Sequence, residues 1–411
     1  MTFLGHLRDM VTVGSLYSTE KMNPSVRRFL LVFSVCATWV LISWAPICKY
    51  LSHGKATAAI LLGILFIALG MRWLDRLNQK QCQIGAGWFV LLFLIMTAAF
   101  AVLYPVSLRH TLNAGSDRED ALRIELNAVH HHQYPYDTHT FLGNPPTPLP
   151  GSMLLATPFF VLGHIAWQNF LWLALFFVFT IRFFRHRATA LFFLAVFLML
   201  APANLSDFTA GGDYLTNFFY VAIAAALFIR SLDRAYYVCF PVAFFLGITL
   251  SSRIIYAVIL IPLLALVLQR TSRSRAIALF AIVFIAATAV TLPIFTPHVF
   301  THLLQQLDQN ARKLQYIPSA LHPRWTLPVL AVIVACTTFF VRMNFQRLFL
   351  IFSITSFVML APFVVTYSLH SEKLRFNFSY LGICTLSFSL WALARYERIS
   401  MSTPYGSHSS S

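Results

Sequence analysis

Apolar runs of membrane-spanning length recur along almost the whole chain. A helix needs about 20 consecutive apolar residues to cross roughly 30 Å of hydrocarbon. The pattern predicts twelve transmembrane helices, at 29–51, 56–74, 84–106, 166–184, 188–203, 214–231, 235–252, 254–270, 275–294, 327–342, 347–368 and 378–395. Because twelve is an even number of crossings, both chain ends are expected on the same side of the membrane.

Residues 151–164 are apolar but too short to cross comfortably. If they crossed, the basic connection 182–187 would lie outside and the acidic segment 207–213 inside, against the positive-inside rule. We therefore interpret this segment as a re-entrant or interfacial helix broken at Pro158, which protein or water must shield. The predicted fold is an all-α polytopic membrane protein, with about twelve transmembrane helices, this extra helix and a helical first outer loop.

Composition supports the membrane assignment, and the distribution of charge gives an orientation. Hydrophobic residues make up 58% of the chain and charged residues 11%, which leaves too little polar surface for a soluble domain. The net charge of +16 is not a nucleic-acid footprint, because 19 of the 30 Lys and Arg residues fall in connections on the N-terminal side. The positive-inside rule makes that side cytoplasmic.

The predicted organisation is a cytoplasmic segment at 1–28, a transmembrane domain at 29–398 and a disordered cytoplasmic tail at 399–411. Two long connections face outward, at 109–150 and 296–325, and the first continues into the short apolar helix as an outer loop over 109–165. The first 28 residues show no cleavable leader, so we expect the first span to direct insertion. The six cysteines lie mostly in or beside spans without a CxxC pair, so neither disulfides nor cysteine metal sites are expected.

Candidate chemistry concentrates in the polar 109–150 segment. Ser116 followed by Glu119 matches a capping box and predicts the start of a helix. Asp117 and Asp120 then lie about one turn apart on one face. These acids either complement the helix dipole or form part of a site. The opposite, apolar side of the helix is formed by Leu122, Leu126 and Val129.

The second half of this segment has a restricted shape. Four prolines between Pro145 and Pro150 predict an extended, rigid path back to the membrane. A rigid outer loop of this length is typical of a functional loop. The three consecutive histidines at 130–132 point about 100° apart on a helix, so we expect solvated or sugar-stacking rings and no metal site.

Several of these features together resemble a known group of enzymes. The matching residues are Asp117, Tyr134-Pro135-Tyr136, Pro145-Pro146, the stretch 154–159 and the stretch 246–253. They resemble the first outer loop and a later span of GT-C-fold glycosyltransferases, and most closely those of glycosyltransferase family 87, which uses polyprenyl-phosphate-mannose. The aromatic residues that usually follow the first acid are replaced by Arg118-Glu119-Asp120, which leaves open whether Asp117 or Asp120 is the matching acid.

The resemblance implies an inverting transfer of a sugar from a polyprenyl-phosphate donor to a hydroxyl of a glycan or glycolipid acceptor outside the membrane. Asp117 or Asp120 would accept the hydroxyl proton as general base. No cofactor, metal or nucleic acid is expected. The cations that would bind the donor phosphate are Arg253, Lys373, Arg375 and Arg324, and the expected acceptor or sugar contacts are His132, Tyr134, Tyr136, Asp207 and Asp213. The alternative roles are interfacial anchoring for the cations and helix capping for Asp213.

Two other functions fit the same sequence. Twelve spans suit a secondary transporter or a flippase of lipid-linked sugars, although the charged residues cluster in the outer loops rather than at mid-membrane, where coupling sites lie. A catalytically inactive assembly partner is the third alternative. In each case we expect a multi-pass protein of the bacterial plasma membrane, and the enzyme would have its active site on the extracytoplasmic side.

Overall fold

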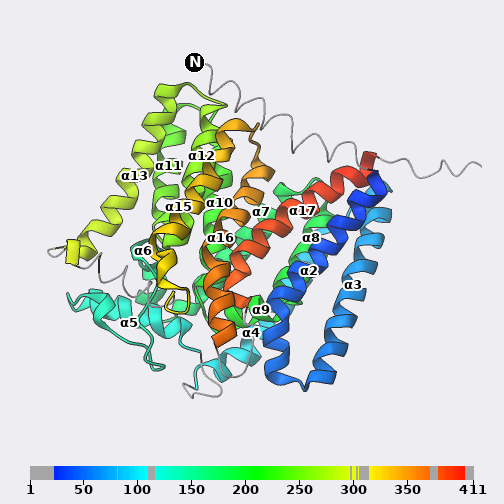
Figure 1. Cartoon of the computed structure of the whole chain (residues 1–411), viewed down its shortest axis with the longest axis horizontal. Coiled ribbons are helices and arrows are strands. Elements are labelled where there is room, and N and C mark those ends of the chain that lie inside the picture. The colour runs from blue at the N-terminus through cyan, green and yellow to red at the C-terminus, as the bar shows by residue number, and fades with distance from the viewer. Residues whose placement is uncertain are drawn as a thin grey trace, which may run out of the picture.

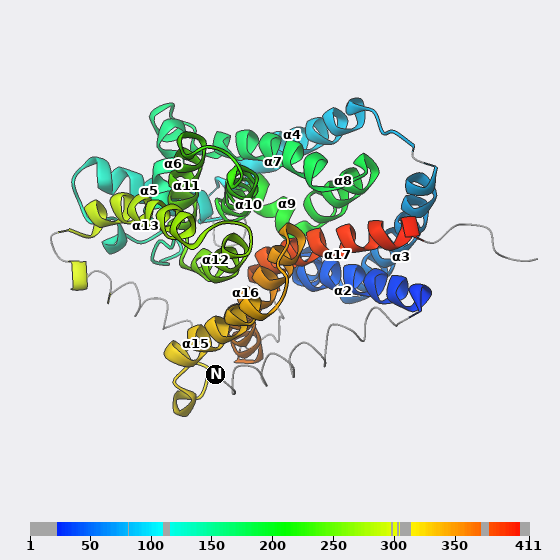
Figure 2. The same cartoon turned by 90° about the horizontal axis from the view of Figure 1, so that it is seen from above.

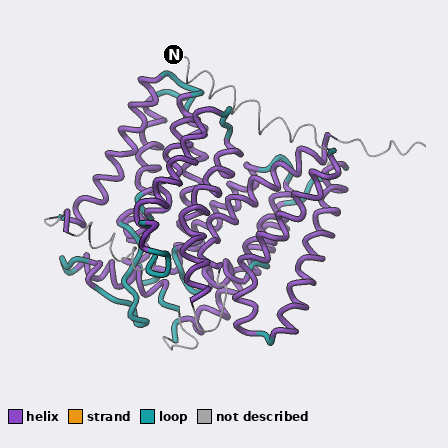
Figure 3. The backbone as a smooth tube through the Cα atoms, in the orientation of Figure 1, coloured by secondary structure: helices purple, strands orange, loops and turns teal. Residues whose placement is uncertain are grey.

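The computed structural model describes residues 23–80, 82–109, 116–296, 299–301, 304, 314–370 and 378–402. Within these ranges every regular element is a helix and no strand occurs (Figure 3). Helices suit so apolar a chain because they satisfy every backbone polar group within one segment. The α-helices are α2 (Pro24–Tyr50), α3 (His53–Gln79), α4 (Ala86–Ser107), α5 (Arg118–His130), α6 (Pro150–Val161), α7 (Gln168–Phe183), α8 (Arg187–Leu194), α9 (Pro202–Thr209), α10 (Tyr214–Ser231), α11 (Tyr236–Leu250), α12 (Leu260–Leu268), α13 (Arg273–Phe295), α15 (Pro323–Cys336), α16 (Phe345–His370) and α17 (Gly382–Ser402).

Short helical turns join several of these helices. They are η1 (Pro135–Asp137), η2 (Ile165–Trp167), η4 (Ile254–Ile259), η5 (Ser319–Leu321), η6 (Thr337–Phe340) and η7 (Phe378–Leu381), all 3₁₀, and the π-helical turn η3 (Ala195–Met199). The long helices form a bundle, and α5 lies across one end of it (Figure 1).

Eight helices in the described ranges are long and apolar enough to cross a membrane, or up to nine if one bent pair counts as a single span. This is the pattern of a multi-pass helical membrane protein. The eight are α2, α3, α4, η2 with α7, α10, α13, α15 with η6, and α16.

The predicted total of twelve crossings is not confirmed, although each predicted segment corresponds to a helix. The two segments expected at 235–252 and 254–270 form short apolar helices, at Tyr236–Leu250 and Ile254–Leu268. Helix α17, which covers the last predicted span, carries charged residues in its final turns.

Two helix breaks lie elsewhere than the sequence pattern predicts. The segment expected as one span at 188–203 bends by 73° between Met199 and Pro202, and α9 then occupies much of the expected loop at 204–213. A proline at the first position of α9 favours a new helix start there. Helix α6 is short, as expected for a segment that does not span, but it runs through Pro158 without a break.

The bundle is built around α10. Its spanning window is 78% buried, against 22% for those of α3 and α4, so α10 is central and those two are peripheral. Seen from above, α5, α6, α11, α12 and α13 lie on one side of α10, and α2, α3, α8 and α17 on the other (Figure 2). Stacked phenylalanines such as Phe176 against Phe219, with ring centroids 4.2 Å apart, fill the interior around it.

Candidate site at one end of the bundle

Helix α5 rests on the bundle through the apolar side that its sequence predicts. Leu122 and Leu126 are buried in a separate cluster with residues of η1, α6 and α13, and Val129 packs against it. The rings of Tyr136 in η1 and of Tyr134 just before it both contact Phe295 at the end of α13. This cluster holds α5 against α6 and against the C-terminal end of α13.

The first turn of α5 differs from the predicted capping box. The helix begins at Arg118, and Asp117 is its N-cap residue without a side-chain capping bond. The Asp117 carboxylate instead accepts hydrogen bonds from the Thr140 hydroxyl (3.0 Å) and the Asn144 amide (2.8 Å), both to Oδ2. Glu119 turns toward Arg123 and forms an ion pair with it.

Asp120 also holds the loop that follows η1. Its Oδ2 accepts a hydrogen bond from the backbone N–H of Phe141 (3.1 Å). Both candidate bases are partly exposed. One carboxylate oxygen of each accepts a hydrogen bond from the 140–144 turn, and this bond orients the side chain. The geometry therefore leaves the choice between Asp117 and Asp120 open.

The proline-rich segment 145–150, here called the strap, binds the end of α11. The Leu149 N–H donates to the Ser252 carbonyl (2.9 Å), and the Gly151 N–H donates to the Ser251 carbonyl (3.2 Å). A side chain at Gly151 would overlap the Ile248 carbonyl, so glycine permits this close approach. The buried Tyr136 hydroxyl donates to the Pro148 carbonyl (3.0 Å) and ties the strap to η1.

Arg253 follows α11 and reaches back to the strap. Its guanidinium pairs with Asp213 Oδ1 (2.5 Å) and donates to the Thr147 hydroxyl (3.1 Å). The Arg253 side chain is 17% exposed and lies over the Tyr214 ring, 5.6 Å from its centroid. The Asp213 side chain does not cap α10. Its second oxygen accepts from the Asn217 amide (3.0 Å) instead.

A second ion pair joins α5 to the start of α10. Arg118 pairs with Asp207 of α9, and the other oxygen of Asp207 accepts from the Leu215 N–H (2.7 Å). Asp207 thus supplies the helix cap that the sequence suggested for Asp213. A side chain at Gly212 would overlap the Asp207 carboxylate, so the turn before α10 requires a residue without Cβ there.

Glu125 is the unexpected member of this region. It lies on α5 between Leu122 and Leu126, is fully buried, and neither carboxyl oxygen has a hydrogen-bond partner among the described residues. Burial raises the pKa of Glu125 well above its ordinary value. Asp213 raises it further, while Arg253 acts in the opposite direction. Both members of the Arg253–Asp213 pair therefore act electrostatically on this carboxyl, and its burial favours the protonated form.

The remaining predicted site residues have different surroundings. His132 is exposed and lies two residues after the end of α5, with a φ of 58°. Tyr134 is partly exposed, whereas Tyr136 is buried and has the structural bond described above. Arg324 lies in the first turn of α15, with its guanidinium 5.5 Å from the Trp325 ring centroid. Lys373 and Arg375 lie outside the described residues, as do the first 22 residues, much of 296–325 and the tail after 402.

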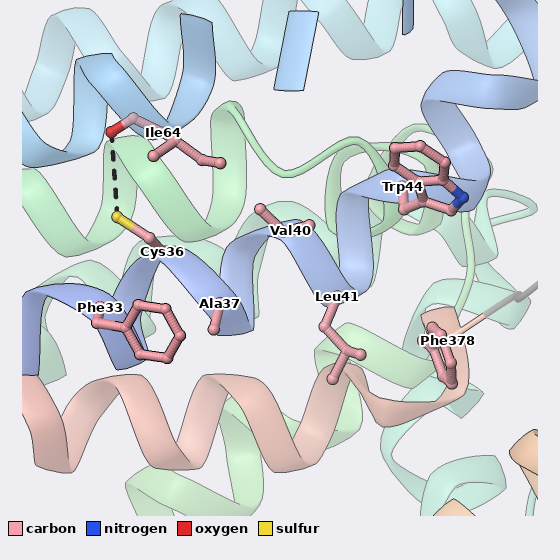
Figure 4. Close-up of a pocket in the computed structure, with 8 residues that line it drawn as sticks. All are labelled: Phe33, Cys36, Ala37, Val40, Leu41, Trp44, Ile64 and Phe378. Atoms are coloured by element: carbon pink, nitrogen blue, oxygen red, sulfur yellow. Dashed lines mark hydrogen bonds between the residues drawn. The ribbon is translucent and has the colours of Figure 1, made fainter. Parts of the chain in front are cut away.

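Residues of α2, α3 and η7 line an apolar groove of about 510 Å³ (Figure 4). It is lined by α2 from Phe33 to Trp44, by Ile64 of α3 and by Phe378 of η7, and Phe378 lies at the end near Leu41 and Trp44. Two residues after Phe378, the Tyr380 carbonyl accepts a hydrogen bond from the Tyr214 hydroxyl. Since the Tyr214 ring lies beneath Arg253, η7 connects the groove to the charged residues.

Sequence reasoning missed the roles of Arg118, Glu119 and Glu125. A usable signal existed for Glu125, because its spacing from Leu122 and Val129 places it within the apolar stripe of α5. A carboxylate in such a stripe is rarely buried without a reason. Arg118 and Glu119 gave no comparable local signal, because their partners depend on the fold.

Comparison of the chain with protein-family models, with curated proteins and with solved structures gives no match. The resemblance to GT-C glycosyltransferases therefore rests on the sequence motifs, and the arrangement of residues must be judged by its own chemistry.

Proposed function

We propose that this protein is a GT-C-type glycosyltransferase that moves a sugar from a polyprenyl-phosphate donor to an acceptor hydroxyl. The observation that carries the proposal is the position of Arg253. Its guanidinium is held beneath the outer segment that presents Asp117 and Asp120, because the strap and Asp213 both bind it. A phosphate-binding cation and two candidate bases then share one end of the bundle.

The chemistry requires both kinds of group. The acceptor oxygen attacks the anomeric carbon of the sugar, and the bond from that carbon to the phosphate oxygen breaks. The acceptor proton passes to the Asp117 or Asp120 carboxylate. The phosphate leaves on its lipid with the bonding electrons, and Arg253 stabilises its growing negative charge. Attack opposite the leaving group inverts the anomeric centre.

The apolar groove supports a lipid-linked donor. Its lining suits an isoprenoid chain, and its volume is within the ordinary range for small-molecule sites, about 300–1,000 Å³. A lipid tail in the groove would end near η7, which contacts Tyr214 beneath Arg253. We propose that the donor phosphate lies between this end of the groove and Arg253.

The test is incubation of the purified protein with radiolabelled polyprenyl-phosphate sugars, mannose among them. We expect slow hydrolysis of the donor alone, or transfer when acceptor glycans are added. Counterflow of the intact donor in vesicles without bond cleavage would establish a carrier instead and overturn the proposal.

Variants then identify the base. Asp117→Asn or Asp120→Asn should abolish transfer while leaving membrane expression unchanged. The matched control is Asn144→Ala, which removes a hydrogen-bond donor to Asp117 but keeps its carboxylate. If both aspartate variants retain full activity, the assignment of the base is wrong. If Asn144→Ala is as inactive as Asp117→Asn, the role of Asp117 is to hold the loop.

A further inference from the structure

Glu125 has no part in the transfer reaction described above, yet burying its carboxyl without hydrogen bonds costs folding free energy. An ionised carboxylate without hydrogen bonds is strongly disfavoured in a buried site, and even a neutral one loses the bonds that it made to water. Among the described residues it is the buried acid with both oxygens unbonded; Asp207 and Asp213, by contrast, are fully paired. A group kept at such a cost next to a cation is a candidate for ligand contact.

The charged and titratable neighbours of Glu125 determine its state. Asp213 precedes α10 and Arg253 precedes η4, and they already neutralise each other. Tyr136 of η1 interacts electrostatically with the carboxyl, and Tyr134 and Asp137 are its neighbours in the chain. Helix α6 and η2, which also pack on α5, contribute no titratable group. This set contains no unpaired cation, so burial and the charge of Asp213 both favour the protonated form of Glu125.

We propose that neutral Glu125 donates a hydrogen bond to a phosphoryl oxygen of the lipid-linked donor while Arg253 balances the charge of that phosphate. A neutral carboxyl can donate this bond, whereas an ionised one has no proton to donate and would repel the anion. The site would then favour a phosphodiester, which carries a single negative charge, and the hydrogen-bonding proton would be supplied by Glu125. The inference rests on the proposed function and adds a donor-recognition residue to it.

Binding of a short-chain donor tests the idea without requiring catalysis. The probe is farnesyl-phosphoryl-mannose, whose diester charge does not change between pH 6 and pH 9, measured with detergent-solubilised protein by equilibrium binding of the radiolabelled lipid. We expect wild-type affinity to fall as pH rises. Glu125→Gln keeps a neutral donor and should bind equally well at every pH in this range.

Two further variants decide between explanations. Glu125→Leu is neutral but cannot donate, so we expect binding about tenfold weaker than that of Glu125→Gln, which corresponds to about 1.4 kcal/mol. Glu119→Gln changes a buried acid on the same helix that is already paired with Arg123, and should keep the wild-type pH profile. Equal binding by the Leu and Gln variants would overturn the proposal, because no donated hydrogen bond would then exist.

The results of these experiments distinguish a wrong role for Glu125 from a wrong assignment of the glycosyltransferase function. If Glu125 were instead the general base, Glu125→Gln would bind donor but lose transfer at every pH, and the proposal would be wrong while the enzyme assignment stood. If the wild-type protein binds no polyprenyl phosphodiester, both proposals fail. Retained transfer and a flat binding profile in Glu125→Gln, with weaker binding in Glu125→Leu, support the assignment.

Discussion

Replacing Asp213 with Asn tests whether the buried ion pair with Arg253 holds the end of the bundle together. The Asp213 side chain is 4% exposed and that of Arg253 17%, so neither charge is well solvated. Two unit charges about 4 Å apart attract by about 4 kcal/mol at an effective dielectric constant of about 20. Desolvation offsets much of this attraction, but removing one partner leaves the other charge buried, which costs about 3–5 kcal/mol.

We expect Asp213→Asn to fall at the lower end of that range, about 3 kcal/mol, because the amide keeps the shape of the side chain and can accept one hydrogen bond. Arg253 would retain its bond to Thr147. Arg253→Gln should also destabilise the fold, and the double variant should be less destabilised than the sum of the two. We expect a coupling of about 2 kcal/mol, within the range found for residues in direct contact.

The assay is unfolding in mild detergent by titration with sodium dodecyl sulfate, followed by tryptophan fluorescence. Asp233→Asn is the matched control, because Asp233 is exposed in the connection after α10 and its replacement should change stability by no more than about 0.5 kcal/mol. Strictly additive losses, or an Asp213→Asn midpoint equal to that of the control, would refute the reasoning.

Three further substitutions test other parts of the site by the same unfolding assay. Gly212→Ala should destabilise the folded protein by about 1–3 kcal/mol because the new methyl group overlaps Asp207. The control Gly54→Ala, in the open first turn of α3, should be neutral or slightly stabilising. Equal effects of the two substitutions would contradict the overlap. Tyr136→Phe should cost about 1 kcal/mol through the lost bond to the strap, and no change would show that this bond does not hold it. Glu125→Gln should match wild-type stability near pH 4 and exceed it increasingly as pH rises, because the folded-state pKa of Glu125 is raised above its ordinary value of about 4.3. A gap that does not grow with pH would mean that Glu125 is ionised without cost in the folded protein.

The helical class, and a helix at each predicted span, could be predicted because they depend on local hydrophobic pattern. The number of crossings could not, since α11 covers only 15 residues of the segment predicted at 235–252 and is shorter than a membrane-spanning helix. The bend between Met199 and Pro202 was missed for a related reason. The apolar run continues across it, and only the proline marks the place where α9 begins.

The assignment of the site residues stays a prediction. The sequence pattern indicated Asp117 and Asp120, and the family resemblance added Arg253. The outer-loop helix, its apolar side and the strap are present in the structure. The sequence pattern could not show which charged residues form ion pairs. Arg253 and Asp213 are 40 positions apart, and Arg118 and Asp207 are 89 apart, so their contacts depend on how the helices pack.

The N-terminus of α10 connects the two ion pairs, and this has a consequence for ligand binding. Asp207 caps the helix while it holds Arg118, and Asp213 precedes the same helix while it holds Arg253. The positive end of the helix dipole favours both carboxylates there. A phosphate that approaches Arg253 must therefore compete with a carboxylate that the helix itself stabilises. In the proposed complex, a hydrogen bond from Glu125 to the phosphate would offset part of the binding free energy lost to this competition. Glu125 and the Arg253–Asp213 pair would therefore act together in binding the phosphate.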